Sequence, residues 1–133
     1  MKALHRIGKT IKWEAAHVLK GLPPGHPCGC VHGHSYKAEI VLYGEQLDET
    51  GFLVDFNVLK VVRNALDHKL LNDLPGFKEK NPSAENIAGW IAEKVCDLLL
   101  QLQADQDVGL ESVTVFETES SWAQIVLPMK ELG

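Results

Sequence analysis

Residues 32–43 carry an alternation that restricts both the fold and the chemistry open to this chain. Apolar side chains recur there at every second position, which is the period of a β-strand with one buried face. They are Tyr36, Ala38, Ile40 and Leu42. His32 and His34 have the same parity, so a strand would present both imidazoles on its apolar face. Two imidazoles held on one rigid face can share a metal ion.

A second alternating segment, residues 4–17, supplies a candidate for a third ligand. Its apolar residues of one parity include Ile11, Trp13 and Ala15. His17 shares this parity and would therefore lie on the apolar side of its own strand. Catalytic zinc commonly has three protein ligands and an open position for water or substrate. We therefore predict a zinc site made by His17, His32 and His34.

The cysteines offer an alternative zinc site. Three cysteines do not make a disulfide framework, but Cys28 and Cys30 directly precede the paired histidines. A closed structural site would combine Cys28, Cys30, His32 and His34. Structural sites usually leave about two to four residues between the ligands of a pair, and alternating single-residue spacing on one strand is awkward for four ligands. The site of three histidines is therefore the favoured prediction.

The remaining patterns predict four strands and two helices in one domain. The strands cover residues 4–17, 32–43, 111–117 and 122–128. The first helix follows a capping Asp55 and ends near Asp67 and His68, and the second starts within residues 81–85. This order predicts an α+β fold in which two helices cover one face of a four-stranded antiparallel sheet. The open edges of such a sheet invite pairing with further subunits.

Two residues near these elements are assigned ordinary structural roles. His26 lies in the loop 21–27, which is rich in proline and glycine, and we expect it to be exposed. Cys96 falls within the apolar pattern of the second helix. Because free cysteine is commonly buried as a small apolar side chain, we expect Cys96 to be buried.

Composition bounds the class of protein and its partners. The 133 residues suffice for a single domain, residues 1–133. A net charge of -5 does not indicate a nucleic-acid partner, which usually leaves a basic footprint. No apolar run approaches the ~20 residues that span a bilayer, and the amino terminus has no hydrophobic secretory segment. We therefore expect a cytoplasmic protein with a small-molecule partner and no membrane partner.

Five short motifs follow one another along nearly the whole chain. They are Ala15-Ala16-His17, Cys28 followed by His32-Gly33-His34, Asp67-His68, Pro82-Ser83-Ala84-Glu85-Asn86, and Phe116-Glu117-Thr118. In this order and spacing they resemble the family of 6-pyruvoyltetrahydropterin and 6-carboxytetrahydropterin synthases. The resemblance implies a tunnelling fold of order ββααββ, in which trimers close an antiparallel barrel. It also implies a homohexamer of two trimers with active sites between subunits.

The resemblance further implies a reaction and roles for the motif residues. These roles are zinc binding by His17, His32 and His34, proton abstraction by Cys28, a relay of Asp67, His68 and Glu117, and a hold on the pterin by Glu117. The implied substrate is 7,8-dihydroneopterin triphosphate. The short chain is most similar to bacterial enzymes of queuosine (7-deazapurine) biosynthesis, which form 6-carboxy-5,6,7,8-tetrahydropterin, acetaldehyde and triphosphate. The alternatives are a 6-pyruvoyltetrahydropterin synthase, which retains the side-chain carbons, and a noncatalytic zinc-stabilised assembly module.

These roles agree with the chemistry of the residues. A thiolate beside cationic zinc is stabilised. The resemblance favours Cys28 over Cys30 as the base, because the three-residue gap between Cys28 and His32 matches the family pattern. His68 alone would be explained by a helix end, which favours histidine. Glu117 shares the parity of the apolar residues before it, and an unpaired buried carboxylate is costly. The N–H donors of a pterin would pair with this carboxylate. The alternative is that Glu117 is an exposed acid at the end of a strand.

Overall fold

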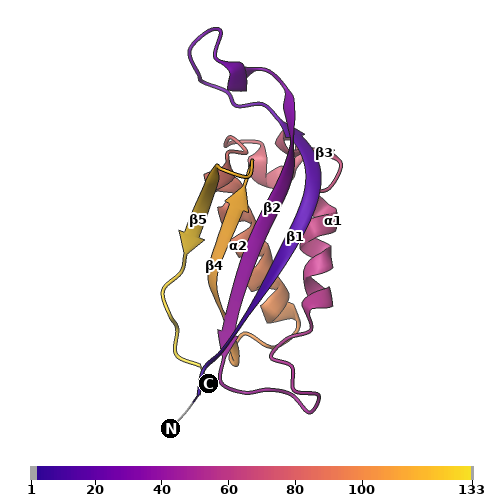
Figure 1. The fold of residues 1–133 in the computed structure, drawn as a ribbon, viewed down its shortest axis with the longest axis vertical. Coiled ribbons are helices and arrows are strands. Elements are labelled where there is room, and N and C mark those ends of the chain that lie inside the picture. Colours follow the sequence, from indigo (N-terminus) through magenta and orange to yellow (C-terminus); the bar gives the residue numbers. More distant parts are fainter. Residues whose placement is uncertain (1–2, 133) are drawn as a thin grey trace.

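The computed structural model describes residues 3–132, which form one mixed β-sheet with two helices on one of its faces (Figure 1). The strands are β1 (His5–His17), β2 (His32–Gly44), β3 (Lys69–Leu70), β4 (Val108–Phe116) and β5 (Trp122–Val126). The α-helices are α1 (Lys60–Leu66) and α2 (Ala84–Gln101), and short 3-10 turns cover Pro27–Gly29, Phe56–Leu59, Leu71–Asp73 and Pro75–Phe77. The strand order is β3-β1-β2-β4-β5. The predicted α+β class is confirmed.

The pairing of β1 with β2 forms the centre of the sheet. The two strands are antiparallel and stay in register over their full length, up to His17 opposite His32. The predicted parity is confirmed, because Trp13 is 2% exposed and Tyr36 is 1% exposed. These two rings lie opposite each other and stack with centroids 5.2 Å apart. Aromatic pairs of this kind stabilise a fold by ~0.5–1.5 kcal/mol beyond their buried area.

Capping side chains begin both helical segments where the sequence predicts them. The side chain of Asp55 accepts a hydrogen bond from the backbone N–H of Asn57 at 2.9 Å, before the 3-10 turn that leads into α1. Ser83 accepts one from the N–H of Asn86 at 3.2 Å and caps α2. The buried residues of α2 recur every three or four positions and include Ile87, Ile91, Val95 and Leu99. This face of α2 packs on β4 and β5.

The structure corrects three predictions about these elements. The four-stranded antiparallel sheet is wrong, because β3 adds a fifth strand that runs parallel to β1. The strand predicted to begin at residue 111 begins at Val108, because the run through Gly109 continues the pairing with β2. Cys96 is exposed, since it follows Val95 on α2 and lies beside the buried face. The barrel of several subunits that the resemblance implies stays a prediction.

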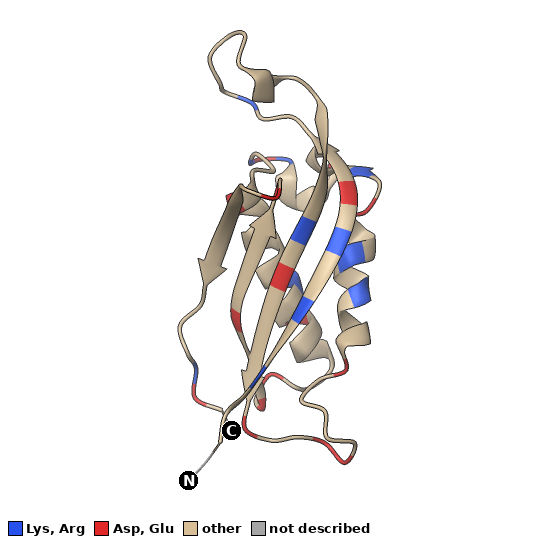
Figure 2. Cartoon of the chain, in the orientation of Figure 1, with Lys and Arg blue, Asp and Glu red and all other residues tan. Residues whose placement is uncertain are grey.

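The sheet face turned away from the helices is polar. Its exposed residues on β1 include Lys12 and Glu14, and Glu39 is exposed on β2. Figure 2 shows basic and acidic residues interspersed along these two strands, with no continuous basic stripe in this view. Within residues 3–132, no helix has the length and apolar character needed to cross a membrane.

Candidate functional site

His17, His32 and His34 meet on the helix-side face of the sheet, at the ends of β1 and β2. Each offers a ring nitrogen, and these three atoms lie within 4.8 Å of one another. The Nε2 atoms of His17 and His32 are 2.9 Å apart. His17 is 1% exposed, and the other two rings are half-buried. The predicted three-histidine cluster is therefore present, and we call these residues the histidine triad.

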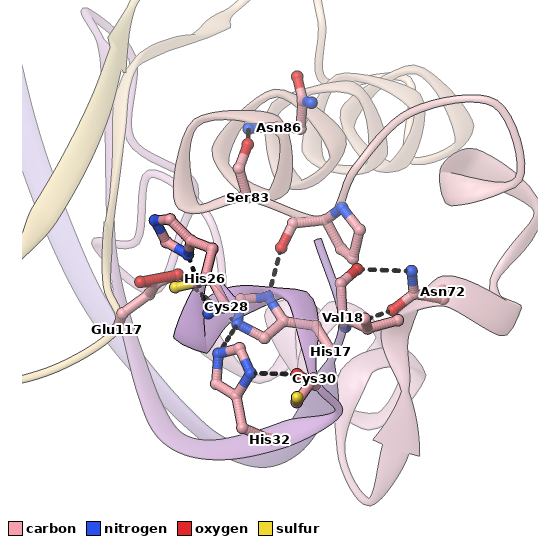
Figure 3. Close-up of polar contacts among 11 residues, drawn as sticks. His17, Val18, His26, Cys28, Cys30, His32, Asn72, Ser83, Asn86 and Glu117 are labelled. Carbon is pink, nitrogen blue, oxygen red and sulfur yellow. Dashed lines mark hydrogen bonds and ion pairs between the residues drawn. The ribbon is translucent and has the colours of Figure 1, made fainter. Parts of the chain in front are cut away.

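Backbone carbonyls determine which ring nitrogens of His17 and His32 carry protons. Nδ1 of His17 lies 2.7 Å from the carbonyl oxygen of Pro82, and Nδ1 of His32 lies 2.7 Å from that of Cys30 (Figure 3). A carbonyl can only accept, so both Nδ1 atoms donate, and in a neutral ring Nε2 then keeps a lone pair. Such contacts orient metal-binding histidines in many proteins.

The donor set fits a metal ion. Two Nε2 lone pairs facing each other at 2.9 Å repel unless a cation or a proton lies between them. The Nε2 atom of His34 is buried and has no hydrogen-bond partner among the described residues. Burial lowers the pKa of His34, and the charges of His17 and His32 add to this, whereas Glu117 opposes it. A neutral imidazole is the form that binds metal.

Glu117 lies beside the triad, immediately after β4. Its Oε2 atom is 3.9 Å from Nε2 of His17, and its side chain is 25% exposed. Its backbone N–H donates to the carbonyl of Ser121 at 3.1 Å and closes the connection to β5. The pairing of Lys37 with Phe116 fixes how far β4 extends along β2. The acid therefore occupies the inward position that its parity predicts, whereas Glu119 is exposed.

The two cysteines before β2 differ in their surroundings. Cys28 is half-buried and Cys30 is exposed. In Figure 3 the sulfur of Cys28 points toward the side of Glu117, whereas the sulfur of Cys30 lies on the other side, past His32. Within residues 3–132 the only candidate metal cluster is the histidine triad, which neither thiol joins. The geometry therefore does not support the alternative site of two cysteines and two histidines.

The chain that leaves β1 is held by two asparagine side chains. Asn72 accepts from the N–H of Val18 at 3.0 Å and donates to its carbonyl at 2.9 Å. Asn81 does the same for Lys20, with both distances 2.8 Å. Each amide side chain thus replaces a strand partner for the residue that it contacts. The stem of the loop between β1 and β2 is fixed to the segment that precedes α2.

Asp67 and His68 lie at the end of α1, against the edge of β1. The carboxylate of Asp67 accepts from the N–H of Glu14 at 2.9 Å and lies 2.8 Å from Nδ1 of His68. The hydrogen bond from Glu14 is the largest of several contacts that lower the pKa of Asp67. His68 has a positive φ of 57° and donates its backbone N–H to the carbonyl of Glu14 at 2.6 Å.

The side chain of His68 does not reach the triad of its own chain. It is 79% exposed, and within residues 3–132 no hydrogen bond or ion pair joins it to a triad residue. It lines an open hollow of about 460 Å³ together with Glu14, Ser35 and the triad residue His34. Glu14 and Ser35 have the opposite strand parity to the triad. The structure therefore brings Glu117 to the triad but not the Asp67 and His68 pair.

Sequence reasoning missed two groups that support the predicted residues. The first is the carbonyl of Pro82, which lies 65 residues from its partner His17 and has no local sequence signal. The second is Arg63, whose Nε donates to the carbonyl of Lys12 at 3.0 Å and whose Nη2 lies 3.1 Å from Asp67. The spacing of four residues between Arg63 and Asp67 on a helix could have indicated this pair.

Residues 6–127 match the family described as 6-pyruvoyl tetrahydropterin synthase. The chain belongs to this family. A relative, the 6-carboxy-5,6,7,8-tetrahydropterin synthase of Synechocystis sp., is 38% identical, and the match covers 92% of this chain and 93% of the relative. A dihydroneopterin monophosphate aldolase of Pyrococcus furiosus is 39% identical over 71% of this chain and 76% of its own length. The solved 6-pyruvoyl tetrahydropterin synthase of Caenorhabditis elegans has the same fold, with a TM-score of 0.78 at 24% identity over 95% of this chain and 97% of that chain.

Replacing His17 by alanine should remove most of the bound metal, because two of three inward nitrogens would remain and the buried carbonyl of Pro82 would lose its donor. Metal analysis of the purified proteins measures this. The matched control is His5→Ala, an exposed histidine of β1 outside the triad, which should keep the full metal content. A full metal complement in the His17→Ala protein would show that His17 is not a ligand.

Proposed function

We propose that this member of the 6-pyruvoyl tetrahydropterin synthase family is a cytoplasmic zinc-dependent lyase. Its substrates are 7,8-dihydroneopterin triphosphate and water, and its products are 6-carboxy-5,6,7,8-tetrahydropterin, acetaldehyde and triphosphate. This reaction would serve queuosine (7-deazapurine) biosynthesis. The names of two relatives, 38% identical over 92% and over 67% of this chain, support the carboxylated product. The observation that carries the proposal is the set of three inward nitrogens with an acid 3.9 Å from one of them.

The histidine triad would hold the zinc ion. Zinc bound there would act as a Lewis acid on oxygen atoms of the substrate side chain and favour loss of a proton from the adjacent carbon. The hydrogen bonds from His17 to Pro82 and from His32 to Cys30 hold both rings in the orientation that such an ion needs.

Cys28 would act as the base that removes this proton. It is half-buried in the loop that follows the triad residue His17, and general bases work from within hydrogen-bond reach of the proton that they remove. Cys30 is exposed, and its backbone carbonyl already serves His32, which supports a structural part for that residue. The two thiols therefore have separate roles in this proposal.

Glu117 would hold the pterin ring. A carboxylate can accept two N–H bonds from the aminopyrimidine edge, and its position after β4 places it next to the triad. The pterin ring would then lie beside the triad. These hydrogen bonds would also offset the free-energy cost of partly burying the Glu117 carboxylate.

Asp67 and His68 would complete the site of a neighbouring subunit in a homohexamer of two trimers. His68 is 79% exposed, and within residues 3–132 it makes no hydrogen bond or ion pair with a triad residue, so its side chain is available to another chain. Asp67 fixes the imidazole by its contact with Nδ1, which leaves Nε2 to exchange a proton with the substrate. Each complete site would thus need two chains.

The reaction is tested by incubating the protein with 7,8-dihydroneopterin triphosphate and measuring product mass and acetaldehyde. Cys28→Ala should keep its metal and lose turnover, whereas Cys30→Ala should stay substantially active, because only Cys28 serves as base. A product that keeps the side-chain carbons would indicate a 6-pyruvoyltetrahydropterin synthase. A metal-loaded wild-type protein that leaves the substrate unchanged would indicate the noncatalytic module, and the same assay with the monophosphate tests the other substrate class.

Glu117→Gln should weaken binding of a nonreactive pterin and leave metal content unchanged. Charge-assisted hydrogen bonds contribute ~1.5–3 kcal/mol, so the affinity should fall by about one to two powers of ten. Glu119→Gln is the matched control, since Glu119 is exposed two residues away. Calorimetric titration of both variants measures the difference. Equal affinities for wild type and Glu117→Gln would exclude Glu117 as the residue that holds the ring.

Mixing two inactive variants should restore activity if sites form between chains. Hexamers reassembled from His17→Ala and His68→Ala chains contain sites with an intact triad from one chain and an intact His68 from the other. For a random one-to-one mixture with this geometry, about a quarter of the sites are complete. The control mixture of His17→Ala with Cys28→Ala should stay inactive, because one chain supplies both His17 and Cys28 to each site and every chain lacks one of them. No recovery in the first mixture would place His68 outside the neighbouring site.

A further inference from the structure

Three polar atoms of His26 form hydrogen bonds within the loop between β1 and β2, which also carries Cys28. Its backbone N–H donates to the carbonyl of Pro23 at 3.1 Å, and its own carbonyl accepts from Gly29 at 2.9 Å. Its ring atom Nδ1 accepts from the backbone N–H of Cys28 at 3.1 Å (Figure 3). The carbonyl of Cys28 in turn accepts from Leu19 at 3.0 Å and ties the turn to the loop stem.

The bond from Cys28 to the imidazole specifies one form of the ring. An N–H group can only donate, so Nδ1 must carry a lone pair and the ring is neutral with its proton on Nε2. His26 has extended backbone angles and caps the 3-10 turn Pro27–Gly29. Without this acceptor, the N–H of Cys28 has no other partner among the described residues. The turn that carries the thiol would then lose its side-chain constraint.

We propose that His26 is a positioning residue for Cys28. Its Nδ1 atom, bonded to the Cys28 N–H, holds the turn in the conformation that keeps this thiol half-buried on the side of Glu117. The functional consequence rests on the proposed function, in which Cys28 is the base. The positioning of the turn by His26 does not depend on the proposed function, because the reactivity of the Cys28 thiol can be measured without turnover.

The test compares His26→Ala, which removes the acceptor, with His26→Asn, whose side-chain oxygen can cap the same N–H. Cys28 is made the sole thiol by Cys30→Ser and Cys96→Ser, and its rate of alkylation by iodoacetamide is measured. Loss of a cap typically corresponds to roughly a fivefold change in an equilibrium, so His26→Ala should raise the alkylation rate and lower kcat by about fivefold each. KM and metal content should stay unchanged, and His26→Asn should restore both rates.

A second exposed histidine provides the control for loss of an imidazole. His5→Ala should leave the alkylation rate and kcat at the wild-type values, because His5 lies at the far end of β1. Unchanged alkylation in His26→Ala, or an equal defect in His26→Asn, would overturn the proposal. If His26→Ala alters alkylation but the wild-type protein turns over no dihydroneopterin phosphate, the positioning role stands and the proposed function fails.

Discussion

The antiparallel pairing of β1 with β2 is the interaction on which the site depends. Both strands have 13 residues, and their uninterrupted register puts His17 opposite His32 and His34 opposite Ala15. A slip of one residue would turn a strand over and move its imidazoles to the opposite face of the sheet. The stacked rings of Trp13 and Tyr36 make such a slip costly because both are buried in the core and Tyr36 contacts the rings of His17 and His34.

The orientation of the triad also depends on groups outside the central pair of strands. Pro82 contributes its carbonyl from the segment before α2, and Cys30 contributes one from the end of the loop. Both carbonyls select the same tautomer, in which the Nε2 atoms face one another. The histidine triad therefore links the sheet, the loop and the segment before α2, and binding of an ion there would stabilise all three together.

The sequence predicted the triad because strand geometry converts parity directly into facing side chains, as at His32 and His34. It missed β3, since a two-residue strand has no period to detect. Cys96 was predicted to be buried from the general preference of cysteine, but its position on α2 leaves it exposed. The approach of Glu117 to His17 depends on the register of β4 against β2, which is a long-range property that no local pattern encodes.

The reciprocal contacts of Asn72 and Asn81 have a consequence for how this protein can diversify. They fix the loop stem at Val18 and Lys20, so the chain beyond residue 20 is mechanically separated from the imidazole of His17. Loop tips tolerate changes of length because each added residue costs little closure entropy. Insertions between residues 21 and 25 would therefore change the loop tip while the imidazole of His17 stays in place. The length of this tip can therefore vary among relatives without disturbing the histidine triad.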